Sequence, residues 1–189
     1  MNGKKSPHYR IGFDFDKVFV HYPPLIPDSV INWLYKKKSK TLKYRMPGQL
    51  EQKIRILSHF PLFRHPVEHN IFTLKKLSKK NYPLFLISGR LGFLDKRTAH
   101  WMKKFPIEKY FQEIHFNFKN EQSHLFKNKL IQSLKITHYI DDDLDLLLYL
   151  AKHNPSVKFY WLDTGKISKR DIPFENIKKV QTISEIPNI

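Results

Sequence analysis

The sequence contains no cysteine, which excludes disulfide bonds and thiolate metal sites. Any metal ion must therefore be held by oxygen or histidine ligands. No apolar run approaches the length needed to span a bilayer, and no apolar segment follows the basic N-terminal residues 1–10. The sequence therefore predicts neither a membrane span nor a secretory signal, and we expect a cytoplasmic protein.

Acidic residues are scarce in this chain. The 34 lysines and arginines outnumber the 17 aspartates and glutamates, and the formal net charge is +17. This excess indicates an anionic partner, such as a phosphorylated metabolite, a nucleic acid or an acidic membrane surface. A lysine-rich composition without functional meaning explains it equally well. The lysines occur in short clusters, such as Lys36–Lys38 and Lys75–Lys80, which weakens the case for a dedicated nucleic-acid arm.

Length and periodicity predict one α/β domain with a small insertion. The chain has 189 residues, of which 41% are apolar, and this is enough for a hydrophobic core. Strands are predicted over residues 10–15, 84–87, 114–118, 137–140 and 157–162. Helices are predicted over residues 67–77, 95–104, 127–134 and 144–152, and the polar stretch from residue 164 is expected to be irregular as far as residues 180–186. Strands that alternate with helices favour a doubly wound, Rossmann-like parallel sheet.

A helical insertion is predicted between the first strand and residue 67. Three prolines within residues 23–27 exclude a regular helix or a central strand there. A first helix is predicted from Asp28 or Ser29, and a second over residues 49–58. In the second helix Leu50, Ile54 and Leu57 share one face. We therefore divide the chain into an α/β core, residues 1–20 and 67–189, and a helical cap, residues 21–66.

Polar side chains follow three of the predicted strands. They are Asp14 and Asp16, then Ser88-Gly89-Arg90, then Asp141-Asp142-Asp143. In an open parallel sheet, ligands bind at the carboxyl ends of the strands, where these three groups are expected to meet. Buried carboxylates are costly unless a cation or hydrogen bonds compensate them, so the acids indicate a cation site. As separate features, these acids could instead cap turns or helix N-termini.

The ordered set of these motifs resembles the haloacid dehalogenase-like (HAD) hydrolase superfamily. The motifs are Asp14-Phe15-Asp16, then Ser88 at the end of the next strand, then Lys127 at the start of a helix, then Asp141 and Asp142. The phosphatase branch with a small helical cap is the most similar in layout, and the deoxyribonucleotidases resemble it in style. One departure is Lys17, which stands where these phosphatases commonly have glycine.

The resemblance implies a role for each motif residue. Asp14 is expected to attack phosphorus and form an aspartyl-phosphate, while Asp16 protonates the leaving oxygen and then activates water. Ser88, the amide of Gly89 and Lys127 are expected to hold the phosphoryl oxygens. The expected Mg²⁺ ligands are Asp14, the backbone carbonyl of Asp16, Asp141 and Asp142.

These roles predict a magnesium-dependent phosphatase that acts on a phosphate monoester. A small phosphorylated metabolite is the expected substrate, with a nucleoside monophosphate as the leading candidate. The alternative is a nucleic-acid-binding protein or a polynucleotide end phosphatase that uses the basic surface.

Several assignments stay open at the level of sequence. Lys129 competes with Lys127 as the motif lysine. Asp143 and Asp145 are better placed to cap a helix or to support the ligands than to bind the metal. Arg90 either reaches the substrate or forms a surface salt bridge.

Overall fold

The computed structural model describes residues 9–22, 42–163 and 172–187. Its centre is a six-stranded parallel sheet with the strand order β3-β2-β1-β4-β5-β6. The strands are β1 (Ile11–Phe13), β2 (Leu84–Ser88), β3 (Glu113–Phe116), β4 (His138–Asp141), β5 (Lys158–Leu162) and β6 (Ile177–Val180). Because β1 lies between β2 and β4, the three polar strand ends are neighbours.

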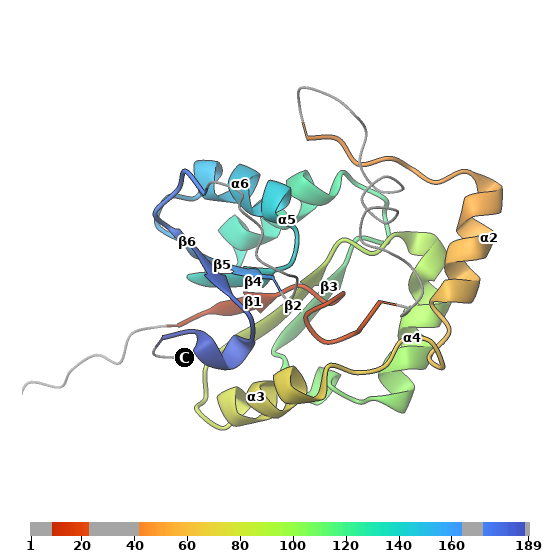
Figure 1. Cartoon of the computed structure of the whole chain (residues 1–189), viewed down its shortest axis with the longest axis horizontal. Coiled ribbons are helices and arrows are strands. Elements are labelled where there is room, and N and C mark those ends of the chain that lie inside the picture. The colour runs from red at the N-terminus through yellow and green to blue at the C-terminus, as the bar shows by residue number, and fades with distance from the viewer. Residues whose placement is uncertain (1–8, 23–41, 164–171, 188–189) are drawn as a thin grey trace, which may run out of the picture.

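Helices cover both faces of the sheet (Figure 1). They are α2 (Gln49–Ser58), α3 (Glu68–Ser78), α4 (Asp95–Lys104), α5 (Ser123–Ser133) and α6 (Leu144–His153), with short 3-10 turns at Gly92–Leu94, Glu108–Tyr110 and Ile183–Glu185. Helices α5 and α6 lie together on one face and α3 lies on the other, while α2 forms an outer edge next to α4. This is the predicted doubly wound α/β architecture, which the structure confirms.

The sheet carries a separate hydrophobic core on each face. Successive residues of β2 point to opposite faces, so Leu84 and Leu86 pack with α3 and α4, while Phe85 and Ile87 pack with α5 and α6. Both sets of β2 side chains are fully buried. The continuous apolar run that predicted this strand is therefore the composition that a strand covered on both faces requires.

Two of the secondary-structure predictions are wrong. Residues 177–180, expected to be irregular, form the edge strand β6, which pairs in parallel with β5. Its burial pattern, with exposed lysines between buried Ile177 and Val180, lacks the alternation that identifies a strand. Helix α5 begins at Ser123, four residues before the predicted start at Lys127. The buried side chains of His124 and Phe126 in its first turn anchor this earlier start.

The predicted insertion leaves and rejoins the core at neighbouring points. His21 N donates to His65 O at 2.9 Å, and Val67 N donates to Phe19 O at 2.9 Å. The division into core and cap stays a prediction. Its first helix, from Asp28 or Ser29, lies outside the described residues.

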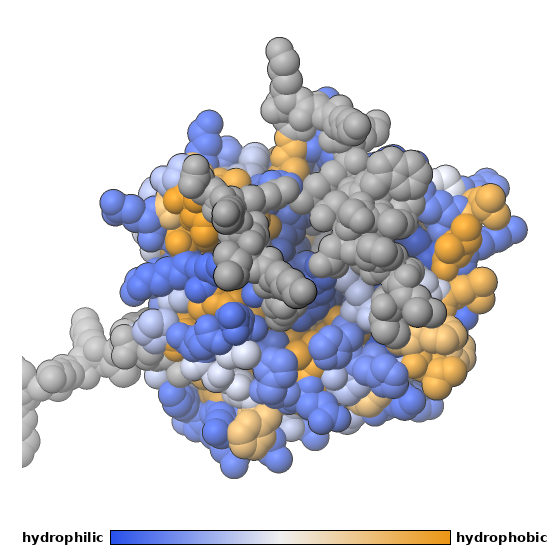
Figure 2. Space-filling view, in the orientation of Figure 1, coloured by the Kyte–Doolittle hydropathy of each residue, from blue (hydrophilic) through white to orange (hydrophobic). Residues whose placement is uncertain are grey.

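Helix α2 coincides with the second predicted helix of the cap, but its apolar face is turned outward. Leu50, Ile54 and Leu57 are 74%, 58% and 65% exposed, whereas Arg55 of the same helix is buried. Figure 2 shows the apolar surface along the edge that α2 forms. Across the described ranges, none of the helices combines the length and the apolar character needed to cross a bilayer.

Candidate active site

The ends of β1 and β4 are aligned by the sheet itself. Phe13 pairs with Ile140, and Asp14 N donates to Ile140 O at 2.9 Å. Asp14 and Asp141 therefore leave adjacent strands at the same level, and both are buried. Ser88 ends β2 on the other side of β1. The structure brings the first, second and fourth motifs together at one edge, as the strand ends predicted.

Lys127 joins the two acids from the side of α5. Its Nζ lies 2.7 Å from Asp14 Oδ1 and 2.7 Å from Asp141 Oδ2. Burial alone would lower the pKa of Lys127, but Asp14 and Asp141 outweigh it and raise the pKa well above its usual range. The lysine is therefore a fixed ammonium between two carboxylates.

Helix geometry and a glycine place Lys127 at this point. A Cβ on Gly89 would lie 2.4 Å from Ser123 Oγ, so glycine lets the first turn of α5 approach the end of β2 without displacing the Ser123 side chain. Lys127 lies one turn further along the helix and reaches the acids. Lys129 is two residues on and points about 200° round the helix. Of the two lysines, the structure therefore places Lys127 in the site.

Three carboxylates form a candidate Mg²⁺ site. Asp14, Asp141 and Asp142 each offer one oxygen, and these oxygens lie within 4.8 Å of one another. Opposite ligands of an octahedral Mg²⁺ ion are about 4.2 Å apart, so a small closure of the cluster would fit the ion. The donor set is all oxygen, which suits this hard cation.

The crowding of the acids favours the binding of a cation at the cluster. Burial, together with Asp141 and Asp16, raises the pKa of Asp14 to about 7 despite the opposing effect of Lys127. Burial, with Asp141 and Asp14, also raises the pKa of Asp142 well above its usual range, although Lys17 opposes this. A divalent ion would stabilise both carboxylates in their charged form.

Asp141 is held in place by Tyr139, which sequence reasoning did not identify, and by the backbone of Asp143. Its Oδ2 accepts from Tyr139 Oη at 3.1 Å, and its Oδ1 accepts from Asp143 N at 3.0 Å. The Tyr139 ring occupies the space above Gly12, where a Cβ would come within 2.8 Å of it. The glycine of β1 therefore makes room for the tyrosine that orients Asp141.

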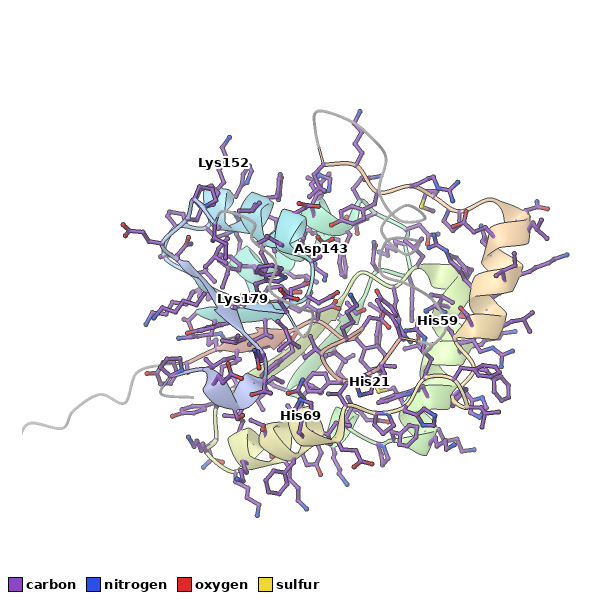
Figure 3. All side chains as sticks on the ribbon, in the orientation of Figure 1. His21, His59, His69, Asp143, Lys152 and Lys179 are labelled. Carbon is purple, nitrogen blue, oxygen red and sulfur yellow. The ribbon has the colours of Figure 1, made fainter. Side chains whose placement is uncertain are left out.

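Asp143 caps α6, as predicted. Its Oδ1 accepts from Asp145 N at 3.1 Å and from Leu146 N at 3.3 Å. Its Oδ2 accepts from Tyr44 Oη at 2.9 Å, which ties residue 44 of the predicted cap to the core. Figure 3 shows Asp143 beside α6 and His59 beside α4.

Asp16 is paired with two arginines. Arg90 donates from Nε to Oδ2 at 2.8 Å and from Nη2 to Oδ1 at 2.7 Å, and Arg64 Nη1 lies 3.5 Å from Oδ1. Burial would raise the pKa of Asp16, but Arg90 and then Arg64 hold this pKa well below its usual range. Asp16 is therefore a carboxylate. Arg90 is buried, so the predicted alternative of a surface salt bridge is wrong.

Sequence reasoning missed Arg64 and its neighbour His59. His59 Nδ1 donates to Arg55 O at 2.7 Å, so its Nε2 accepts from Arg64 Nη2. Burial, then Arg64 and Arg90, lower the pKa of His59 well below its usual range, which keeps the ring neutral at pH 7. The available signal was weak: an arginine and a histidine flanking the apolar residues 60–63.

Known proteins resemble this chain in fold but not in sequence. No protein-family model matches the chain, and no curated protein matches it by sequence. A haloacid dehalogenase-like hydrolase from Bacteroides fragilis superposes with a TM-score of 0.62 at 15% identity, covering 93% of this chain and 98% of that one. The chain has the haloacid dehalogenase-like fold.

Two further solved structures are similar to the chain in fold. The HAD-hydrolase YfnB from Bacillus subtilis, which was solved bound to magnesium, has a TM-score of 0.57 at 11% identity and covers 95% of this chain and 97% of that one. A chain of the Pnkp1/Rnl/Hen1 RNA repair complex has a TM-score of 0.51 at 11% identity. The match covers 84% of this chain but only 43% of that one.

One residue of this haloacid dehalogenase-like fold departs from the expected pattern. Lys17 follows Asp16 with φ 59°, a backbone region where glycine is unstrained and other residues are not. Its Nζ lies 3.3 Å from Asp142 Oδ2. The lysine therefore places a second ammonium group at the carboxylate cluster, where a glycine would place none.

Proposed function

We propose that the chain is a magnesium-dependent phosphatase that hydrolyses a phosphate monoester through an aspartyl-phosphate on Asp14. The observation that carries this proposal is the position of Lys127 Nζ, 2.7 Å from both Asp14 and Asp141, beside a three-carboxylate cluster. The attacking carboxylate and the phosphate are both anionic and repel each other. A fixed positive charge next to both of them is therefore needed.

In this proposal one set of residues holds Mg²⁺ and another set, which includes Lys127, binds the phosphoryl oxygens. Asp14, Asp141, Asp142 and the backbone carbonyl of Asp16 would hold Mg²⁺, which when bound neutralises the charge that builds up between carboxylate and phosphate. Ser88, the amide of Gly89 and Lys127 would bind phosphoryl oxygens.

The reaction would proceed in two displacements. In the first, an oxygen of Asp14 forms a bond to phosphorus, the phosphorus–ester bond breaks and Asp16 gives a proton to the leaving oxygen. In the second, Asp16 removes a proton from water, which attacks phosphorus and releases inorganic phosphate and free Asp14. Asp16 is ionised in the structure, which suits the second step. In the first step Asp16 must carry a proton, which the charge of Arg90 opposes, while the two hydrogen bonds from Arg90 fix the orientation of the carboxyl group.

The substrate we propose is a small phosphorylated metabolite, with a nucleoside monophosphate as the leading candidate. Residues 21–66 would act as the cap that partly covers the site and selects the substrate. The tie between Tyr44 and Asp143 supports this role, because it places part of the segment beside the acids.

The test is hydrolysis of p-nitrophenyl phosphate and of a panel of metabolite phosphates, with Mg²⁺ and with EDTA. We expect activity only with Mg²⁺, and a loss of at least a thousandfold in Asp14→Asn. The matched control is Asp95→Asn on α4, whose side chain is exposed and should leave activity unchanged. Activity that survives in Asp14→Asn, or no activity on any substrate, would overturn the proposal.

A second candidate is a polynucleotide end phosphatase. It is favoured by the net charge of +17 and by the likeness to a chain of an RNA repair complex. Oligonucleotides bearing a terminal phosphate should then bind with an affinity that falls steeply with salt and should lose that phosphate. Weak binding with no dependence on salt would exclude this candidate.

A further inference from the structure

The two acids of the Asp14-Phe15-Asp16 motif form ion pairs with different basic side chains. Asp14 is bound by Lys127, whereas Asp16 is shared between Arg90 and Arg64. The lysine is used by the proposed reaction to balance the nucleophile and the phosphate. Neither arginine binds the substrate in that account, although both are buried and contact Asp16.

We propose that Arg64 and Arg90 form an anion-binding subsite on the leaving-group side, so that the substrate carries a second anionic group close to its phosphate ester. This inference rests on the proposed function. It goes further, because it names the class of leaving group: an alcohol that itself bears a carboxylate or a second phosphate.

The place of the arginines follows from the geometry of phosphoryl transfer. The attacking and leaving oxygens lie roughly in line on opposite sides of phosphorus. If Asp14 attacks, the leaving oxygen faces away from it and towards the acid that protonates it, Asp16. Groups that bind Asp16 therefore border the leaving group, and these groups are two guanidiniums.

Both guanidiniums are held in fixed positions by groups other than Asp16. Arg90 Nη1 donates to Thr98 Oγ1 at 3.0 Å, and its guanidinium lies 4.4 Å from the centre of the Phe15 ring. Arg64 Nη1 donates to His21 O at 3.2 Å, and its guanidinium lies 4.8 Å from the centre of the Tyr22 ring. A guanidinium that is already held in place loses little conformational entropy when an anionic group of the substrate approaches it.

The two arginines differ in how they engage Asp16. Arg90 makes two short hydrogen bonds, which orient the carboxylate. Arg64 approaches only to 3.5 Å, a distance at which attraction between the charges dominates. We therefore assign the larger share of anion recognition to Arg64. The neutral His59 beside it adds no competing charge.

A second acid close to this site is also paired with two arginines. Glu51 is likewise shared between two guanidiniums, those of Arg45 and Arg55. His59 connects the two groups, since it donates to Arg55 O and accepts from Arg64. This side of the site is thus built from four arginines around two acids, a composition suited to an anionic ligand.

The experiment compares substrates that differ only in the second charge. The first pair is 2-phosphoglycolate and 2-hydroxyethyl phosphate, which tests a carboxylate. The second is adenosine 3′,5′-bisphosphate and adenosine 5′-monophosphate, which tests a phosphate. In the wild-type protein with Mg²⁺, we expect kcat/KM to be at least tenfold higher for the more anionic member of at least one pair.

The variant Arg64→Gln should remove this preference selectively. We expect the loss on the more anionic member, mainly in KM, to be about tenfold larger than the loss on its partner, because an effect through Asp16 falls on both members alike. The matched control is Arg97→Gln, because Arg97 donates to Ile56 O and stacks on Phe60 without contributing to the Asp16 pair. This control should keep the preference intact.

The outcomes separate this inference from the function on which it rests. Equal kcat/KM within both pairs overturns the subsite, and so does a proportional loss on both members in Arg64→Gln. If that variant does not fold, as judged by thermal melting, the uncharged Arg64→Met takes its place, and an unchanged preference in it overturns the subsite. No hydrolysis of any of these substrates or of p-nitrophenyl phosphate instead overturns the proposed phosphatase.

Discussion

Arg90 holds Asp16 by both carboxylate oxygens, with Nε 2.8 Å from Oδ2 and Nη2 2.7 Å from Oδ1. This two-point contact fixes the orientation of a carboxylate that stands two residues after the proposed nucleophile Asp14. The same contact keeps Asp16 ionised. Arg90 is thus a positioning residue for the proposed acid and base.

Replacing Arg90 by lysine should impair leaving-group protonation. Lysine keeps the charge but not the planar fork, so the carboxylate loses its orientation. We expect kcat to fall at least tenfold on an alkyl phosphate and much less on p-nitrophenyl phosphate, because nitrophenolate leaves without a proton. Asp16→Asn should lose activity on both substrates, because Asp16 also activates water in the second displacement, and the loss should be larger on the alkyl phosphate, about 10²- to 10⁴-fold. Equal losses on both substrates would contradict this role.

Replacing Lys127 by methionine should destabilise the protein when no metal is present. The change removes the ammonium between Asp14 and Asp141 and leaves two buried carboxylates facing each other. We expect the free energy of unfolding in EDTA, measured with urea, to fall by about 3–5 kcal/mol. Added Mg²⁺ should restore part of the loss. Lys129→Met on the same helix is the control and should change it by less than about 0.5 kcal/mol.

The stabilising effect of Mg²⁺ should grow with pH. The pKa of Asp14 is raised from 3.8 to about 7, so the folded protein binds a proton that the unfolded chain has lost. This proton favours folding fully below pH 3.8, and its contribution is lost as the pH rises through about 7. Mg²⁺ requires the deprotonated carboxylate. The rise in Tm on adding Mg²⁺ should therefore be larger at pH 8 than at pH 5.

The variant Asp14→Asn tests the origin of that pH dependence. The asparagine at position 14 cannot titrate. The fall in Tm between pH 4 and pH 7 in EDTA should therefore be smaller than in the wild type, and the effect of Mg²⁺ on Tm should grow less with pH. If the two curves of the variant match those of the wild type, another group is responsible.

Replacing Lys17 should tighten Mg²⁺ binding. Its ammonium lies 3.3 Å from Asp142 Oδ2 and competes with a metal for that oxygen. We expect the Kd for Mg²⁺, measured by calorimetry, to fall severalfold in both Lys17→Met and Lys17→Gly. Lys17→Gly should also relieve the backbone strain of φ 59°. With Mg²⁺ bound, its free energy of unfolding should therefore be about 1 kcal/mol higher than that of Lys17→Met. Unchanged or weaker Mg²⁺ binding in both variants would contradict this.

The sequence by itself determined five of the six strands and the composition of the sheet's carboxyl edge. A strand buried on both faces needs a run of apolar residues, and the residue that follows such a run must lie at the edge, so Asp14, Ser88 and Asp141 could be placed without coordinates. Both requirements are local, which is why these predictions agree with the structure.

Only the tertiary structure decided which cations meet which acids. Arg90 lies 74 residues from Asp16, and Arg64 comes from the predicted cap, so their convergence depends on where the chain returns to the core. The outward face of α2 has the same cause: an amphipathic pattern shows that a helix has two faces but not what covers either of them. Local composition fixes strands and their ends, whereas charge pairing between distant residues is fixed only by packing.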